Sequence, residues 1–212
     1  MAELMDPNNY LLKVIKKADG HATDAILKVI RAEPKTRFFV EATGFNSAFL
    51  TLCINEKNCR IIFLRDDLFD TATRLTFIEN CPVGRPPGEI YFYASQFGEE
   101  ELKKYLSRKC SVLFWSESIG SLSAFKIKAL ATAFPDQLIV IGKDFNKLLI
   151  SIMLDAPLTM LFKQNDFSTA EILKFAEKGG NRVAIVVEGF TDQELTDFKN
   201  SGALLLPEIV GA

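Results

Sequence analysis

The sequence predicts an α/β protein in two parts, a β-rich part preceded by helices and a doubly wound parallel sheet. Two changes of hydrophobic period predict it. Before Pro34, apolar residues recur at helical spacing, whereas from Arg37 onward the hydrophobic period changes to two. From Cys110 onward, continuous apolar runs are separated by amphipathic stretches. We therefore expect a helical hairpin plus a small antiparallel barrel or sheet over 1–108, and five parallel strands with helices over 109–212.

The N-terminal segment contains two similar stretches, LLKVIKK at 11–17 and ILKVIRA at 26–32. Apolar residues in both recur at helical spacing, which predicts two short amphipathic helices rather than an internal duplication. From Arg37 onward, the stretches RFFVEATG, AFLTLCIN, CRIIFLRD, TRLTFIEN and EIYFYASQ are separated by polar turns and predict antiparallel strands. The stiff loop CPVGRPPGE exposes Arg85, either for a functional contact or as a plain connection.

The second part begins after GEEELKKYLSRK (98–109), which is predicted as a charged helix or an extended connector. Five apolar runs then alternate with four amphipathic helices: CSVLFWSE, DQLIVIGKD, APLTMLFKQ, RVAIVVEG and ALLLPEIV. Such alternation is typical of βαβ units, in which both faces of a parallel sheet are buried.

Composition and charge exclude several classes of protein. The net charge of −2 provides no overall basic field, so we expect neither nucleic-acid binding nor general attraction to acidic lipids. The apolar runs are too short for membrane insertion, and the first residues lack the features of a signal peptide. Four cysteines without a CxxC pair and a single histidine, His21, indicate reduced thiols in the cytoplasm and no metal or other cofactor.

The stretch VAIVVEGFTDQELTDFKNSGALLLPEIV resembles the fourth strand, fourth helix and fifth strand of the receiver domain of bacterial response regulators. That domain has a flavodoxin-like sheet with strand order 2-1-3-4-5. Its site needs carboxylates for Mg²⁺, a phosphorylated Asp, a hydroxyl residue and a Lys; the matching positions here hold Glu117, Lys163 or Gln164, Glu188 and Leu206, followed by Pro207. The resemblance implies a receiver that has lost phosphorylation, and an unrelated flavodoxin-like domain stays open.

Receivers dock their partners through the fourth helix and the fifth strand. The resemblance therefore implies a partner face for another protein or a second copy of the chain, and this face comprises Thr191, Glu194, Phe198, Lys199 and Leu205.

The run RFFVEATGFNSAFLTLCINEKNCRIIFLRDD is similar to the N-terminal barrel of flagellar-brake proteins, which precedes a PilZ domain that binds cyclic di-GMP. The ligand motifs of that family, RxxxR and [D/N]xSxxG, do not occur in this sequence. The resemblance implies a signalling context, and no motif supports cyclic di-GMP binding.

The main functional hypothesis is a non-enzymatic bacterial signalling protein that acts through protein–protein contacts. One alternative is a sensor linked to cyclic di-GMP. Another is a small α/β enzyme with a carboxylate site at the carboxyl ends of the strands, formed by Glu117, Asp144 and Glu188. The absence of a Ser-His or Cys-His constellation counts against the enzyme, and no Gly-rich phosphate loop follows any strand.

Overall fold

The computed structural model describes residues 12–17, 22–63, 69–81, 90–94, 97–114, 123–143 and 145–206. Within them, nine strands form one sheet in which every neighbouring pair is parallel and the spatial order is the order along the chain. The strands are β1 (Leu12–Ile15), β2 (Arg37–Glu41), β3 (Cys59–Phe63), β4 (Ile90–Tyr93), β5 (Ser111–Phe114), β6 (Leu138–Ile141), β7 (Thr159–Phe162), β8 (Val183–Val186) and β9 (Leu204–Leu206).

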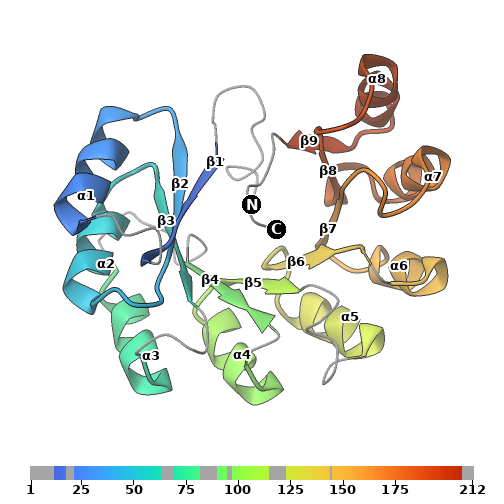
Figure 1. Cartoon of the computed structure of the whole chain (residues 1–212). Coiled ribbons are helices and arrows are strands. Elements are labelled where there is room, and N and C mark those ends of the chain that lie inside the picture. The colour runs from blue at the N-terminus through green and yellow to red at the C-terminus, as the bar shows by residue number, and fades with distance from the viewer. Residues whose placement is uncertain are drawn as a thin grey trace.

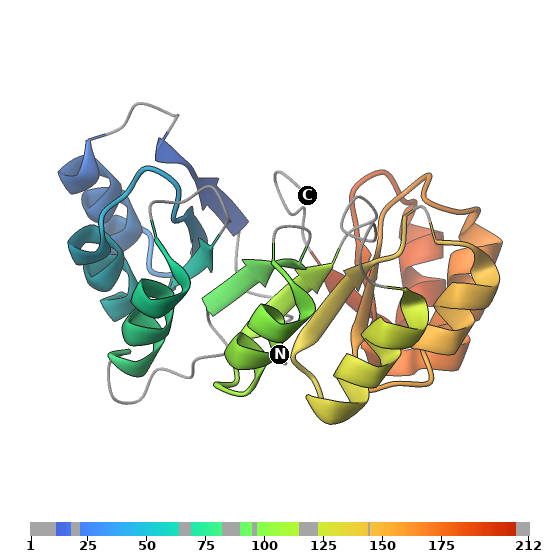
Figure 2. The same cartoon turned by 90° about the horizontal axis from the view of Figure 1, so that it is seen from below.

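A helix of the same number follows each of the first eight strands. The helices are α1 (Thr23–Ala32), α2 (Ser47–Asn55), α3 (Thr71–Glu79), α4 (Glu99–Leu106), α5 (Ala124–Ala133), α6 (Lys147–Met153), α7 (Thr169–Gly179) and α8 (Asp192–Asn200). Figure 1 shows the sheet curled into an open arc with every helix on its convex side, and Figure 2 shows the same layers from below. Right-handed crossovers that always step in one direction along the sheet place all helices on one face.

Both faces of the sheet are buried, and alternate residues of each strand serve different cores. The convex face packs against the helices; in β3, for example, Cys59, Ile61 and Phe63 point that way. The concave face has its own apolar cluster, which consists of Phe39, Ile62, Tyr91, Ile139, Leu161, Ala184, Val186 and Leu206. Burial on both sides explains why the strands read as nearly continuous apolar runs.

One local motif recurs where strands lead into helices. A phenylalanine immediately precedes the N-cap residue of six helices and belongs to the helix-side core or packs against it: Phe45, Phe69, Phe97, Phe145, Phe167 and Phe190. Five positions later, a second residue is directed into the same core, as Leu50, Leu102 and Ile150 are. This pair has the positions of a hydrophobic staple, which fixes how the chain enters each helix. The chain is therefore built from repeated strand–helix units, each packed against the next.

Consecutive helices are also joined at their first turns. In four pairs of neighbouring helices, the side chain of the first residue of one helix forms a hydrogen bond or an ion pair with the side chain of the third residue of the next helix. Thr71 Oγ1 donates to Glu101 Oε1 at 2.6 Å, Lys126 Nζ to Glu99 Oε2 at 3.1 Å and Thr169 Oγ1 to Glu194 Oε1 at 2.7 Å, and Lys147 forms an ion pair with Glu171. These contacts hold the N-termini of neighbouring helices at the same height, beside the carboxyl ends of the strands.

Arg74 of α3 breaks the repeat, because it lies where the other helices place an aliphatic staple residue. Its side chain is buried, its guanidinium carbon lies 4.9 Å from the ring centroid of Phe97, and its Nη1 lies 3.5 Å from Glu101 Oε1. The hydroxyl of Tyr105 donates to the same carboxylate oxygen at 2.6 Å, and burial raises the pKa of this phenol. A buried charge needs a partner, and the next helix supplies it.

The structure corrects the prediction for the first part of the chain. The stretch AFLTLCIN is α2 and TRLTFIEN is α3, whereas 12–15 is a strand, not a helix. Residues with high β-propensity created an apparent period of two, but α2 buries Phe49, Leu50, Cys53 and Ile54, which share one side of a helix. The remaining strands are parallel, so there is no antiparallel barrel among the described residues.

The fold class of the second part is also corrected. Strands and helices alternate as expected from Cys110 onward, but β5 to β9 stand in sequential order instead of 2-1-3-4-5. A flavodoxin-like sheet has helices on both faces, and this sheet has them on one. The expected division between 108 and 109 falls between α4 and β5, and the sheet continues across it through the pairing of Tyr91 with Ser111.

Candidate functional site at the carboxyl edge of the sheet

Because all strands are parallel, their carboxyl ends lie along one edge of the sheet, which we call the carboxyl edge. The turns that follow the strands lead directly into the helices, so the helix N-termini lie at the same edge. In open and closed α/β sheets, ligands bind outside the carboxyl ends of the strands. We therefore consider the polar groups at this edge first.

Lys16 and Glu41 form an ion pair at the end of β1 and β2. Glu41 is the last residue of β2 and lies on the concave side of the sheet, since Phe38 and Val40 face the helices and Phe39 faces inward. Its side chain is only 14% exposed, and its Oε2 lies 3.4 Å from Nζ of Lys16. Glu41 is thus a largely shielded carboxylate with a lysine partner beside an apolar surface, at the place where ligands of parallel α/β sheets bind.

The turn after β2 adds further polar groups next to this pair. Gly44 adopts a left-handed conformation (φ 79°), and a Cβ at this position would lie 2.9 Å from Cγ of Lys17. The lysine side chain thus crosses the backbone of the turn, and its Nζ lies 5.5 Å from the ring centroid of Phe45. The hydroxyl oxygen of Thr43 is buried and has no hydrogen-bond partner among the described residues, which is unusual for a polar atom.

At the far end of the arc, Lys163 and Glu188 follow the neighbouring strands β7 and β8. The backbone N–H of Lys163 donates to Oδ2 of Asp166 at 2.8 Å, so this aspartate holds the turn. The side-chain amide of Gln164 donates to the carbonyl oxygen of Gly189, which ties the two turns together. Glu188 is exposed. The structure thus brings two of the predicted site residues to adjacent positions on the carboxyl edge.

The remaining predicted site residues do not join this group. Leu206 is buried in the concave-face cluster, and Glu117, Asp144, Arg85 and Pro207 lie outside the described residues. No described group of three His, Cys, Asp or Glu side chains is arranged to hold a metal ion.

The predicted partner face centres on α8. Phe198 is fully buried beneath the helix, and Leu205 packs against the helix-side core. Thr191 caps α8, and Glu194 accepts hydrogen bonds from the backbone N–H of Thr191 at 2.8 Å and from Thr169 at 2.7 Å, which lower the pKa of its carboxyl group. Lys199 is exposed.

The sequence prediction did not include Lys16, Lys17, Glu41 or Thr43. The helical spacing of 11–17 conceals that Lys16 follows a strand, and the stretch RFFVEATG predicts a polar turn and a second strand, whereas a helix follows it. The sequence signal that could have found them is the order of residues after the apolar run: a polar residue, a glycine and then an asparagine that can cap a helix.

No protein-family profile matches the chain, and no curated protein sequence matches it. Solved structures do match, among them dihydropteroate synthase from Xanthomonas albilineans with 4-aminobenzoic acid. That protein is 11% identical, the match covers 95% of this chain and 86% of the other, and the TM-score is 0.47. A likeness at this level says nothing about the activity of the present chain.

The signalling hypothesis is corrected by the fold. It joined a pseudo-receiver to a small β-barrel, and the single parallel sheet contains neither a five-stranded flavodoxin-like unit nor, within the described segments, a barrel. None of the helices that the structure describes has the length and apolar character needed to cross a bilayer.

Proposed function

We propose that the protein is a small α/β enzyme that binds a small polar substrate at the carboxyl edge of the sheet. Glu41 transfers a proton to or from the substrate, and Lys16 orients its carboxylate. The observation that supports this most is the position of Glu41, which is partly shielded from solvent, directed to the concave side and paired with a lysine at the end of a parallel strand.

The surroundings of Glu41 suit this role. Phe39 on the same strand and Ile62 on the next form an apolar floor, and Ile62 is the register partner of Glu41. Such a floor excludes water and strengthens the electrostatic effect of the few polar groups at its margin. The buried Thr43 hydroxyl and the Lys17 ammonium supply a donor and a positive charge on the turn that follows.

The purified protein should be incubated with a small-molecule cell extract, and mass spectrometry should follow which compounds are consumed or formed with time. We expect a protein-dependent conversion that Glu41→Gln slows by about 100-fold or more, since loss of a general acid–base group costs about 10²–10⁴ in rate. Glu79→Gln is the matched control, because Glu79 is also an ion-paired glutamate, with Arg108 at 2.9 Å, but it lies at the C-terminal end of α3.

Equal conversion by wild type and Glu41→Gln would remove Glu41 from the mechanism. Absence of any protein-dependent conversion would remove the enzymatic proposal itself. Far-UV circular dichroism of each variant checks that the fold is intact.

A further inference from the structure

The charges in and next to the pair of Lys16 and Glu41 do not balance. Glu41 and Lys16 form an ion pair, so their charges offset each other. Lys17 is exposed, and none of the described carboxylates forms an ion pair with it. Helices α4, α7 and α8 each carry a glutamate as their third residue at the carboxyl edge, whereas α2, which follows the turn beside Lys17, carries Phe49 there. The ammonium group of Lys17 is therefore not compensated by any described side chain.

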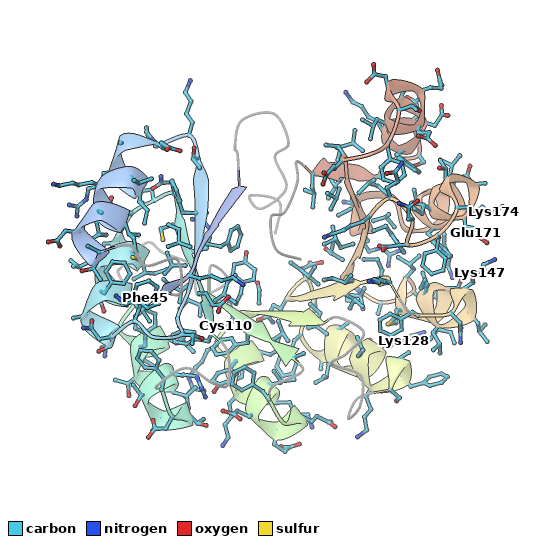
Figure 3. The ribbon with its side chains drawn as sticks, in the orientation of Figure 1. Phe45, Cys110, Lys128, Lys147, Glu171 and Lys174 are labelled. Atoms are coloured by element: carbon cyan, nitrogen blue, oxygen red, sulfur yellow. The ribbon has the colours of Figure 1, made fainter. Side chains whose placement is uncertain are left out.

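The turn after β2 fixes where the stem of Lys17 lies. A Cβ atom at Gly44 would approach Cγ of Lys17 to 2.9 Å, so glycine permits the close passage of the lysine stem over the turn. Nζ of Lys17 lies 5.5 Å from the ring centroid of Phe45, which lies between the sheet and the helices (Figure 3). Glu41 and Gly44 are three residues apart in the chain, so at most about 11 Å separates their Cα atoms. A small molecule can therefore contact Glu41 and Lys17 at the same time.

Thr43 lies between Glu41 and Gly44 in this turn. Its hydroxyl oxygen is buried, and no described residue forms a hydrogen bond with it. Ala42 belongs to the helix-side core, so the alternation of side chains along the chain directs Thr43 to the concave side, as it does Glu41. Buried hydroxyl groups normally have a hydrogen-bond partner, and a ligand oxygen that reaches the turn would supply one. The turn thus offers a hydrogen-bond donor next to the positive charge of Lys17.

We propose that the substrate of this site carries an anionic oxygen group, a carboxylate or a phosphate ester, which binds to Lys17 and to the Thr43 hydroxyl. This substrate class rests on the proposed function, because it concerns the same site. Ammonium and hydroxyl groups donate hydrogen bonds to such an oxygen, and the attraction is stronger beside an apolar floor than in bulk water. Lys16 is engaged by Glu41, so Lys17 is the residue that selects a charged substrate, while Glu41 exchanges the proton.

Amide NMR titration of isotopically labelled protein with inorganic phosphate, and separately with acetate, tests this site without the substrate. We expect saturable shifts of the Thr43 and Gly44 amides. Lys17→Gln should weaken binding by about fivefold, because a charge next to the anion is lost, and Thr43→Val by about threefold. Lys143→Gln is the matched control and should leave binding unchanged, because Lys143 is an exposed lysine in the turn after β6, without an ion-pair partner in the described part of the chain. The proposal fails if neither anion shifts these amides in a saturable way, or if Lys143→Gln weakens binding as much as Lys17→Gln.

Conversion of extract compounds separates the substrate class from the enzymatic function. The compounds that wild type consumes should carry a carboxylate or a phosphate, and Lys17→Gln should raise KM by about fivefold at unchanged kcat, whereas Glu41→Gln lowers kcat. Anion binding without any Glu41-dependent conversion would support the anion site and remove the enzymatic function. Glu41-dependent conversion of an uncharged compound, or an unchanged KM in Lys17→Gln, would overturn the substrate class and leave the role of Glu41 standing.

Discussion

Phe162 and Gly142 should behave as a coupled pair in the folding energetics. Phe162 ends β7, is fully buried, and stacks on Phe175 with ring centroids 5.4 Å apart. Gly142 follows the neighbouring strand β6, and a Cβ on it would lie 2.2 Å from Cε1 of Phe162. Gly142 does not have a positive φ, so the ring is the obstacle to a larger residue at this position.

The magnitudes follow from these contacts. Phe162→Ala should lower the free energy of unfolding by about 3–5 kcal/mol, because it removes a wholly buried ring and leaves a cavity. Gly142→Ala alone should cost about 1–3 kcal/mol through overpacking. In the Phe162→Ala background the obstacle is gone, so the added methyl group should be neutral or stabilise by about 0.4–1 kcal/mol. The coupling energy of the cycle is then about 2 kcal/mol.

Urea denaturation followed by circular dichroism measures all four proteins of the cycle. Gly98→Ala is the control, because a Cβ there meets no atom within 4 Å, and its effect should add to that of Phe162→Ala. A Gly142→Ala effect that is the same with and without the Phe162 ring would refute the reasoning, since the steric conflict would then not be its cause.

Two other predictions concern the helix N-termini. The pKa of Glu171 is held at about 2 by its bonds to Lys147 and to the Ser168 cap, so its stabilising contribution is complete above the unfolded value near 4.5 and is lost as the pH falls toward 2. Glu171→Gln should therefore flatten the dependence of the unfolding free energy on pH in that window, and an unchanged slope would contradict this. Asn146→Ala removes the side-chain acceptor of the Leu149 N–H and should lower the free energy of unfolding by about 1 kcal/mol. Gly98→Ser adds a side-chain cap to α4 and should raise that free energy by about a few tenths of a kcal/mol. Thermal unfolding that ranks Asn146→Ala above Gly98→Ser in stability would exclude this account of capping.

Local signals in the sequence predict most elements of the second half, but not how they assemble. Runs such as LIVI and VAIV are buried on both faces, which indicates parallel strands in any α/β fold. The strand order depends on which face each connecting helix covers, and the hydrophobic pattern of a helix is the same on either face. The resemblance of 183–210 to a receiver rested on one strand–helix–strand unit, which singly and doubly wound sheets share.

The first half was harder for a different reason. Thr, Phe, Ile and Cys in α2 and α3 favour strands, and only the N-caps Asn46 and Asp70 indicated helices. Tertiary packing decides the outcome, because Phe77 and Ile78 in α3 can reach the helix-side core only from a helix at that place in the repeat. The candidate site could not be predicted for the same reason: Lys16 and Glu41 meet only because β1 and β2 are adjacent and parallel.

A repeated fold provides a standard against which unusual residues can be judged. Arg74 departs from the aliphatic residue of its position, and Glu101 and Phe97 of the next unit compensate for it within the chain. That departure needs no external explanation. Phe125 and Leu148 are the second residues of α5 and α6, where the other six helices carry a small or polar residue, and their exposure shows that the chain itself does not cover them. Single exposed apolar side chains are common on folded proteins, and Val29 and Leu52 are exposed on α1 and α2 as well, so this second departure does not by itself require a partner.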